Sequence, residues 1–219
     1  MNNPAISMNY ESLGVYQKNI LKTIFINSLR GTTFSLEGLS EDLTLSLEYV
    51  TPVCNELADL GIISKKNDSW VLTELGRKQI VVVLAGGVFD IIYPGHLFTL
   101  SSAKKLGDIL VISIAKDETV QKLKNRYPLN KEKMRQKLVG SLRIVDLALL
   151  GNTTDMFKMI ETVKPDVIAL GYDQKHDTDE LIKESNRRSL QIKVVRFSSS
   201  IENNKSSSII KDSVAINEF

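Results

Sequence analysis

Residues 86–96, GGVFDIIYPGH, decide the fold of this 219-residue chain. The segment before them, Ile80 to Ala85, is apolar and rich in β-branched residues, which predicts a buried parallel strand. The segment after them, residues 97–106, has apolar side chains at helical spacing. The side chains expected to share one face of that helix are Leu97, Leu100, Ala103 and Leu106. Because free backbone N–H groups and the positive end of a helix would meet at the turn, the stretch predicts an anion-binding site.

Length and composition limit the possible classes of protein. A chain of 219 residues holds one or two domains, and its 42% of hydrophobic residues is enough for a core. The net charge of +2 is too small to indicate a polyanionic partner. Cys54 is the only cysteine, so no intrachain disulfide can form, which fits a reducing cytoplasm. No signal peptide and no apolar stretch near the ~20 residues of a membrane span are present, so we expect a cytoplasmic protein without membrane contact.

Residues 1–79 are expected to form one domain and residues 80–219 a second. In the first domain, apolar spacing predicts three helices followed by a hairpin. The expected ranges are residues 14–29, a short helix after Ser35, residues 46–60, and hairpin strands at 62–65 and 69–72. This order of elements resembles a winged helix-turn-helix domain. Residues 55–76, NELADLGIISKKNDSWVLTELG, are typical of that family.

The charge of the first domain argues against DNA binding. Residues 1–79 contain seven Lys and Arg against nine Asp and Glu, and the third helix contains no basic residue. Since neutralisation of phosphates supplies most non-specific DNA affinity, we favour a dimerisation or docking role, with a homodimer as one outcome. The residues expected to face inward from the third helix are Val50, Val53, Leu57 and Leu60. Cys54 on the same helix is expected to be a packed structural thiol, because the domain has no histidine to activate it.

Apolar strands and helices alternate through residues 80–219. The strands expected after the first one cover residues 108–115, 145–150, 166–170 and 192–196. The helices expected between them cover residues 118–125, 130–142, 155–163 and 177–188. This alternation predicts an α/β domain with a Rossmann-like, doubly wound parallel sheet of five strands. In such sheets ligands bind at the carboxyl ends of the strands.

The residues that follow these strands suit a nucleotide. Gly86 and Gly87 allow the backbone to approach a phosphate, and His96 would lie beside the bound anion. The cations near this turn are Lys122, Lys124, Arg126 and Arg135. Long cations of this kind suit a triphosphate. A serine-rich segment follows the last strand, and serines at a helix start offer further hydroxyl and N–H groups to phosphate.

The decisive stretch resembles the Gly-x-Phe-Asp-x-x-His-x-Gly-His signature of cytidylyltransferase-like nucleotidyltransferases. Tyr93 stands where that signature has its first histidine. Other matching features are Arg126 and Pro128 ahead of a helix with Arg135, and residues 164–177, KPDVIALGYDQKHD. Together with the serines near the C-terminus, these features resemble the archaeal FAD synthetases, and the GYDQ segment favours this branch over glycerol-3-phosphate cytidylyltransferase.

The resemblance implies an FMN adenylyltransferase, which joins ATP to FMN and releases FAD and pyrophosphate with a divalent cation, Mg²⁺. It implies catalytic roles for four residues, which are His96, Tyr93, Lys122 and Arg126. It implies nucleotide contacts for Gly87, Val88, Phe89, Asp90, Gly95, His96, Asp173, Ser206, Ser207 and Ser208. It assigns no metal ligands, although Asp90 occupies a position that is structural or linked to the metal.

Tyr93 leaves alternatives open. A phenol donates only a neutral hydrogen bond, whereas an imidazolium carries charge to the phosphates, and charge-assisted bonds are roughly twice as strong. We therefore expect Tyr93 to alter the rate or the contacts with the phosphate acceptor. One alternative is a nucleotidyltransferase for another phosphorylated acceptor, such as glycerol 3-phosphate or phosphopantetheine. Another is a catalytically silent regulator that senses a nucleotide or flavin.

Overall fold

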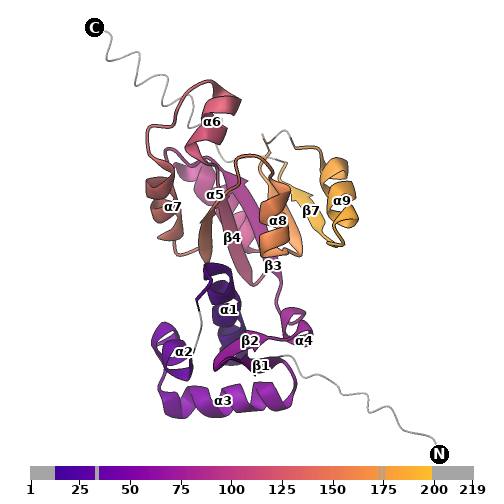
Figure 1. Cartoon of the computed structure of the whole chain (residues 1–219). Helices are drawn as coiled ribbons and strands as arrows, with labels where there is room; N and C mark the ends of the chain where they lie inside the picture. The colour runs from indigo at the N-terminus through magenta and orange to yellow at the C-terminus, as the bar shows by residue number, and fades with distance from the viewer. Residues whose placement is uncertain (1–12, 33–34, 173, 175, 199–219) are drawn as a thin grey trace, which may run out of the picture. The chain divides into compact units, whose positions relative to one another are not determined.

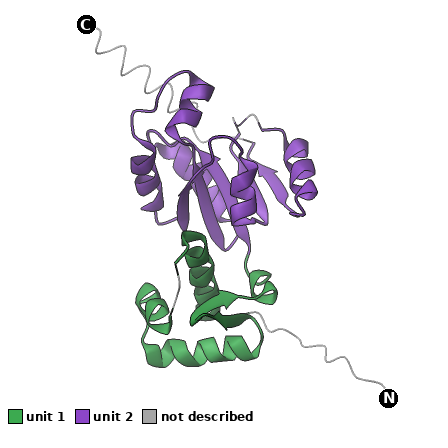
Figure 2. Cartoon of the chain, viewed as in Figure 1, with its two compact units in different colours: residues 1–80 green, residues 81–219 purple. Residues whose placement is uncertain are grey.

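The chain divides into two compact units, Met1–Ile80 and Val81–Phe219 (Figure 2). The computed structural model describes residues 13–32, 35–172, 174 and 176–198.

The first unit combines helices with one antiparallel hairpin (Figure 1). Its elements are α1 (Val15–Arg30), α2 (Leu36–Leu43), α3 (Leu47–Asp59), β1 (Ile63–Lys66), β2 (Ser69–Leu72) and α4 (Glu74–Arg77). The hairpin turn at Asn67 and Asp68 has φ angles of 49° and 60°, the left-handed conformation that tight hairpin turns require. The order of elements agrees with the sequence pattern, while the winged-helix assignment and the absence of DNA binding stay predictions.

Helix α3 buries a narrower face than the pattern predicts. Val50, Cys54 and Leu57 are buried, but Leu60 is 40% exposed and Val53 is partly exposed. Leu60 was expected to face inward, and that prediction is wrong because Leu60 is the C-cap of α3 and Gly61, with a φ of 68°, changes the direction of the chain directly after it. Cys54 is packed into the core, as its position on the helix predicts.

The second unit is built on a parallel sheet of five strands, in the order β5-β4-β3-β6-β7. The strands are β3 (Val82–Gly87), β4 (Ile109–Ile114), β5 (Leu147–Leu150), β6 (Val167–Leu170) and β7 (Lys193–Arg196). The sequence order reverses between β3 and β6, which makes that pair the switch point of a doubly wound sheet. The predicted Rossmann-like α/β fold is confirmed.

Helices cover both faces of this sheet (Figure 1). They are α5 (Pro94–Lys104), α6 (Asp117–Lys124), α7 (Glu132–Gly140), α8 (Phe157–Val163) and α9 (Thr178–Arg187). Because the crossovers are right-handed, α5 and α7 lie on one face and α8 and α9 on the other. An apolar core cluster of the unit packs Val83, Ala85 and Ile112 of the sheet against Leu100 and Ala103 of α5.

The decisive stretch differs from expectation in two details. Gly86 and Gly87 end strand β3 instead of forming the turn, since both pair in register with β4. Helix α5 begins at Pro94, a residue well suited to the first helical position, so the stretch with apolar helical spacing starts about one turn into the helix. Leu97 is consequently 40% exposed near the start of α5, so its predicted place on the buried face is wrong.

In the described part of the chain, none of the helices combines the length and the hydrophobicity that a membrane crossing needs.

Leu100 should contribute much of the stability that comes from packing α5 against the sheet. It is 1% exposed, so Leu100→Ala leaves a cavity and should lower the free energy of unfolding by about 2–5 kcal/mol. Leu97→Ala is the matched control on the same helix and should cause a much smaller loss. Urea unfolding of both variants checks this, and equal losses would contradict the assigned orientation of α5.

Cys54 should resist modification in the native protein. Burial raises the pKa of its thiol to about 11, because an apolar environment disfavours the thiolate. At pH 8 the reactive thiolate is then about two to three orders of magnitude scarcer than for an exposed cysteine. We expect iodoacetamide to label Cys54 in urea but only very slowly in native protein, as measured by intact mass. Rapid native labelling would show that the first unit opens at α3.

Candidate functional site

The start of α5 lies at the carboxyl end of β3, where the sequence predicts an anion site. Tyr93 is the N-cap with extended backbone angles, and Pro94, Gly95 and His96 form the first helical turn. The backbone N–H of His96 donates to the carbonyl of Tyr93 at 2.9 Å. The imidazole is therefore attached to the positive end of an eleven-residue helix.

Two aromatic rings hold the imidazole of His96. The ring centroid of Tyr93 is 4.4 Å away at an edge-on angle of 69°, and that of Phe89 is 5.2 Å away. Phe89 adopts a φ of 52°, a left-handed conformation that is rare for a bulky residue. Strained backbone of this kind persists where surrounding contacts enforce it, and it clusters at functional sites.

Two glycines make room for these rings. A Cβ atom on Gly87 would approach the Phe89 ring to 2.8 Å, and one on Gly95 would approach the Tyr93 ring to 2.6 Å. Both distances are too short for a real contact. The sequence pattern attributes Gly87 to a close approach of phosphate, but the structure supplies a second reason, which is the packing of the aromatic rings around His96.

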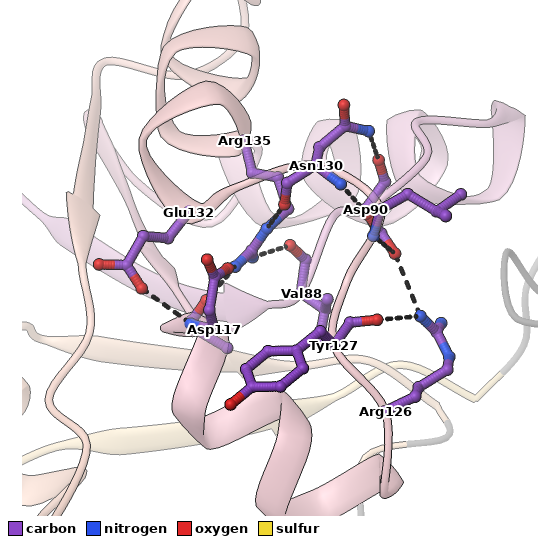
Figure 3. Close-up of polar contacts among 10 residues, drawn as sticks. Val88, Asp90, Asp117, Arg126, Tyr127, Asn130, Glu132 and Arg135 are labelled. Atoms are coloured by element: carbon purple, nitrogen blue, oxygen red, sulfur yellow. Dashed lines mark hydrogen bonds and ion pairs between the residues drawn. The ribbon is translucent and has the colours of Figure 1, made fainter.

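Asp90 is a buried anchor for the segment after α6 (Figure 3). Its carboxylate accepts hydrogen bonds from the backbone N–H groups of Leu129 at 3.0 Å and Asn130 at 2.9 Å, and it forms an ion pair with Arg126 at 3.4 Å. The Asn130 side chain donates to the Asp90 carbonyl at 2.8 Å. Asp90 thus has the structural role that the sequence left open. In the described ranges no three His, Cys, Asp or Glu side chains gather as a metal site would require.

Arg135 was expected among the cations that face a triphosphate, and that prediction is wrong. Its side chain is fully buried, and all three of its nitrogens donate hydrogen bonds inside the protein. The acceptors are the carbonyls of Val88 at 2.6 Å, Ala115 at 2.7 Å and Asn130 at 2.8 Å, with the Asp117 carboxylate at 2.8 Å. Arg135 therefore joins the turns that follow β3 and β4 (Figure 3).

The remaining cations differ in whether their charged groups already have hydrogen-bond or ion-pair partners. Lys122 and Lys124 lie on the exposed side of α6, and no hydrogen bond or ion pair joins either of them to another residue within the described ranges. Arg126 is about one-third exposed and shares its guanidinium between Asp90 and the carbonyl of Tyr127, at 3.0 Å for the latter. The two lysines can reach a phosphate without breaking an existing contact, whereas Arg126 would exchange partners.

Gln174, in the GYDQ segment, has a role at the site that the sequence pattern did not specify. Its side-chain amide donates to the carbonyl of Gly86 at 2.7 Å, and its side-chain oxygen accepts from the N–H of Gly171 at 3.0 Å. It thereby ties the loop after β6 to the end of β3, across the switch point. The GYDQ segment was the signal for this residue, but the sequence alone does not show which of its side chains reaches β3. Asp173, Ser206, Ser207 and Ser208 lie outside the described residues.

A pocket of about 280 Å³ opens beside this turn, on the sheet face covered by α8. Its walls come from the ends of β3, β4 and β6, from α6 and from α8. Aliphatic and thioether side chains dominate the lining, including Leu84, Leu123, Met156, Met159, Ile160 and Ile168. Its polar side chains are Ser113, Thr119, Asn152, Gln174 and His176. Its volume is slightly below the ~300–1,000 Å³ typical of small-molecule sites.

Comparisons with known proteins agree with this geometry. The family model described as cytidylyltransferase-like matches residues 84–213. The FAD synthase of Aciduliprofundum boonei is 50% identical over 118 residues, which cover 54% of this chain and 78% of that protein. The FAD synthase of Thermoplasma acidophilum is 42% identical over 135 residues, which cover 62% of this chain and 94% of that protein. This chain belongs to the FAD synthase family.

A solved structure supports the same fold for this FAD synthase family member. It is described as the lipopolysaccharide core biosynthesis protein from Thermoplasma volcanium, and it is 42% identical with a TM-score of 0.54. The match covers 56% of this chain and 99% of that one. The likeness therefore extends over little more than half of this chain, about the length of one domain.

The structure brings together part of the set predicted for an FAD synthase. Val88, Phe89, Asp90 and Tyr93 lie between the end of β3 at Gly87 and the first turn of α5, which contains Gly95 and His96, and Asp90 pairs with Arg126. Lys122 lies on α6, which begins in the turn that Arg135 holds. Their assigned roles stay predictions.

Removal of Arg135 should destabilise the second unit strongly. Arg135→Met leaves three carbonyls and the Asp117 carboxylate without a buried donor, and breaking a buried pair typically costs about 3–5 kcal/mol. Chemical unfolding monitored by circular dichroism measures the loss. Arg187→Ala, at an ion pair whose arginine side chain is 68% exposed, is the control and should leave stability almost unchanged. A stable Arg135→Met protein would contradict the bridging role.

Proposed function

We propose that this chain transfers AMP from ATP to FMN, giving FAD and pyrophosphate. The observation that carries the proposal is identity of up to 50% to FAD synthases over the unit that contains the predicted site. The anion-binding turn, the neighbouring lysines and the apolar pocket support it, because the two substrates require phosphate contacts and an apolar ring site.

In this reaction a phosphate oxygen of FMN attacks the α-phosphorus of ATP. A new bond forms between them, the bond from the α-phosphorus to the bridging oxygen breaks, and pyrophosphate leaves. The protein forms no covalent intermediate, so its contribution is positioning and stabilisation of charge. We assign His96 to donate to the phosphates, since it lies in the first turn of α5 and two rings restrict its orientation.

The exposed cations of α6 would act on the leaving group. Negative charge accumulates on pyrophosphate as the bond breaks, and fixed cations stabilise that charge. Lys122 and Lys124 have their ammonium groups available, and Arg126 is held close to the turn by Asp90. Their spacing along one short helix and the following loop suits contacts with different phosphates of the same chain.

The described residues do not offer a metal site of their own. Both oxygens of Asp90 already accept backbone hydrogen bonds. Mg²⁺ binds preferentially through substrate phosphates with few protein ligands. We therefore propose that any Mg²⁺ arrives bound to ATP.

A direct assay tests the proposal. The full chain, incubated with FMN, ATP and Mg²⁺, should form FAD and pyrophosphate in equal amounts, as measured by chromatography. His96→Ala should lower kcat by about 10²–10³-fold, the typical loss for one donor to developing charge. Lys105→Ala, exposed at the opposite end of α5, is the control and should retain full activity.

Three results would contradict the assigned role of His96 or the proposed activity. FAD formation that His96→Ala does not slow would remove His96 from the mechanism. Absence of FAD with turnover of another phosphorylated acceptor, such as glycerol 3-phosphate or phosphopantetheine, would favour the alternative transferase. Nucleotide or flavin binding without turnover of any of these acceptors would favour a sensing role.

Tyr93 should act mainly through its ring. Because the ring packs over Gly95 and against His96, Tyr93→Phe should keep kcat within about threefold, whereas Tyr93→Ala should lower it about tenfold or more by freeing the imidazole. The measurement is kcat at saturating FMN and ATP. If Tyr93→Phe is as slow as Tyr93→Ala, the hydroxyl itself contacts the substrate. A faster Tyr93→His would show that a neutral phenol limits the rate.

A further inference from the structure

The pocket beside the anion-binding turn has a structural cause, which is a row of small residues. Gly86 pairs with Ser113 in the adjacent strand, so these two positions lie level with each other. Gly151, just after β5, lies against the same serine, since a Cβ there would be 3.0 Å from the Ser113 hydroxyl. Small residues thus lie next to one another at the ends of β3 and β4 and just after β5, and all three line the pocket.

The pocket has an apolar inner end and a polar mouth. Leu84 and Ile168 pair with each other two residues before Gly86 and Leu170, so they lie farther from the carboxyl edge. Ile160, which is 2% exposed, closes that end from α8. Gln174 lies at the opposite end, where it binds the Gly86 carbonyl.

The mouth exposes apolar surface that a ligand could cover. Leu123 is 78% exposed and Met156 is 39% exposed, although both line the pocket. Thr119 lies one helical turn before Leu123 and so shares its face of α6, which also lines the pocket. Thioether sulfurs make favourable contacts with aromatic rings, so Met156 and Met159 suit a flat ligand.

From these features we infer that the pocket binds the isoalloxazine ring of FMN, and that Gly86 sets the depth available to it. The inference rests on the proposed function and identifies which part of the site holds the acceptor. The ring of FMN has one edge, the dimethylbenzene end, without hydrogen-bonding groups, and this edge matches the aliphatic inner end. Adenine has nitrogen atoms around its whole outline, so its burial at that end would leave polar groups unsatisfied.

The placement also connects the ring to the reaction. Gly86, Gly87 and Val88 line the pocket and lead directly into the turn that carries His96. A ring bound against α8 can therefore extend its phosphate chain over the carboxyl edge of β3 toward α5.

Substitution at Gly86 tests the depth of the pocket. By strand alternation the side-chain position of Gly86 faces α8, like that of Leu84. A Cβ there would meet its nearest neighbour, the Ser113 carbonyl, at 3.4 Å, which is about an ordinary contact, so Gly86→Ala and Gly86→Val should fold. Gly140→Ala on α7 is the matched control, because its Cβ would meet Ala148 at 3.5 Å outside the pocket.

Binding is measured by flavin fluorescence, with and without a non-hydrolysable ATP analogue, and binding of the analogue by calorimetry. Gly86→Val should raise the Kd for FMN by about tenfold or more, since added side-chain volume cannot be accommodated in a filled site. Gly86→Ala should have an intermediate effect, and Gly140→Ala none. The Kd for the ATP analogue should change less than about threefold in all three variants.

A second variant and a ring-only probe exclude a folding artefact. Leu123→Ser removes an exposed side chain, so it should leave the unfolding midpoint unchanged while weakening FMN binding by about threefold to tenfold through lost apolar contact. Lumiflavin, which has the ring without the phosphate, should compete with FMN in the wild type and bind more weakly to Gly86→Val. It should not compete with the ATP analogue.

The outcomes separate the two proposals. Weaker binding of the ATP analogue with unchanged FMN binding would place adenine in the pocket and overturn the inference. Unchanged binding of both ligands in Gly86→Val would place the flavin ring elsewhere, while FAD formation by the wild type would still support the proposed function. FMN binding that Gly86→Val weakens, in a protein that forms no FAD, would support the pocket assignment and contradict the function.

Discussion

The buried guanidinium of Arg135 is the interaction on which the site depends. It donates to carbonyls of the turns after β3 and β4 and to Asn130, and it pairs with Asp117 at the start of α6. Backbone carbonyls at the ends of parallel strands have no ladder partner, so burying them requires a donor from elsewhere. One planar group satisfies several of them and also fixes their spacing. Arg135 thereby fixes the turn after β3 and the start of α6 relative to each other.

Asp90 complements this arrangement with the opposite charge. Its carboxylate accepts from backbone N–H groups of residues 129 and 130, whereas Arg135 donates to the carbonyl of the same Asn130. The segment after α6 is therefore held from both sides, although it contains exposed apolar residues such as Tyr127 and Leu129. With these charges used internally, exposed cations remain on α6, where a phosphate chain can reach them. In this way Arg135 and Asp90 stabilise the structure of the site, while the exposed lysines of α6 are the cations that we propose for the substrate.

The sequence pattern identified the correct strands and helices of the second unit because their signals are local. Apolar runs of β-branched residues and helical spacing depend only on near neighbours, and the Gly, Asp and His positions of the decisive stretch follow from one turn. The resemblance to FAD synthetases could be recognised for the same reason, since its main motif is continuous. The errors arose near element ends, since Leu60 is the C-cap of α3 and Leu97 lies in the first turns of α5, and both side chains are exposed.

The amino-acid order alone determined the α/β domain and predicted an anion site before α5, because each strand, turn and helix is encoded by residues close together in the chain. Only the tertiary structure decided that Arg135 is a buried bridge and not a phosphate ligand, since its acceptors lie up to 47 residues away. Gln174 likewise contacts Gly86 across 88 residues. The apolar pocket under α8 also arises from small residues on three strands that meet only in the folded sheet.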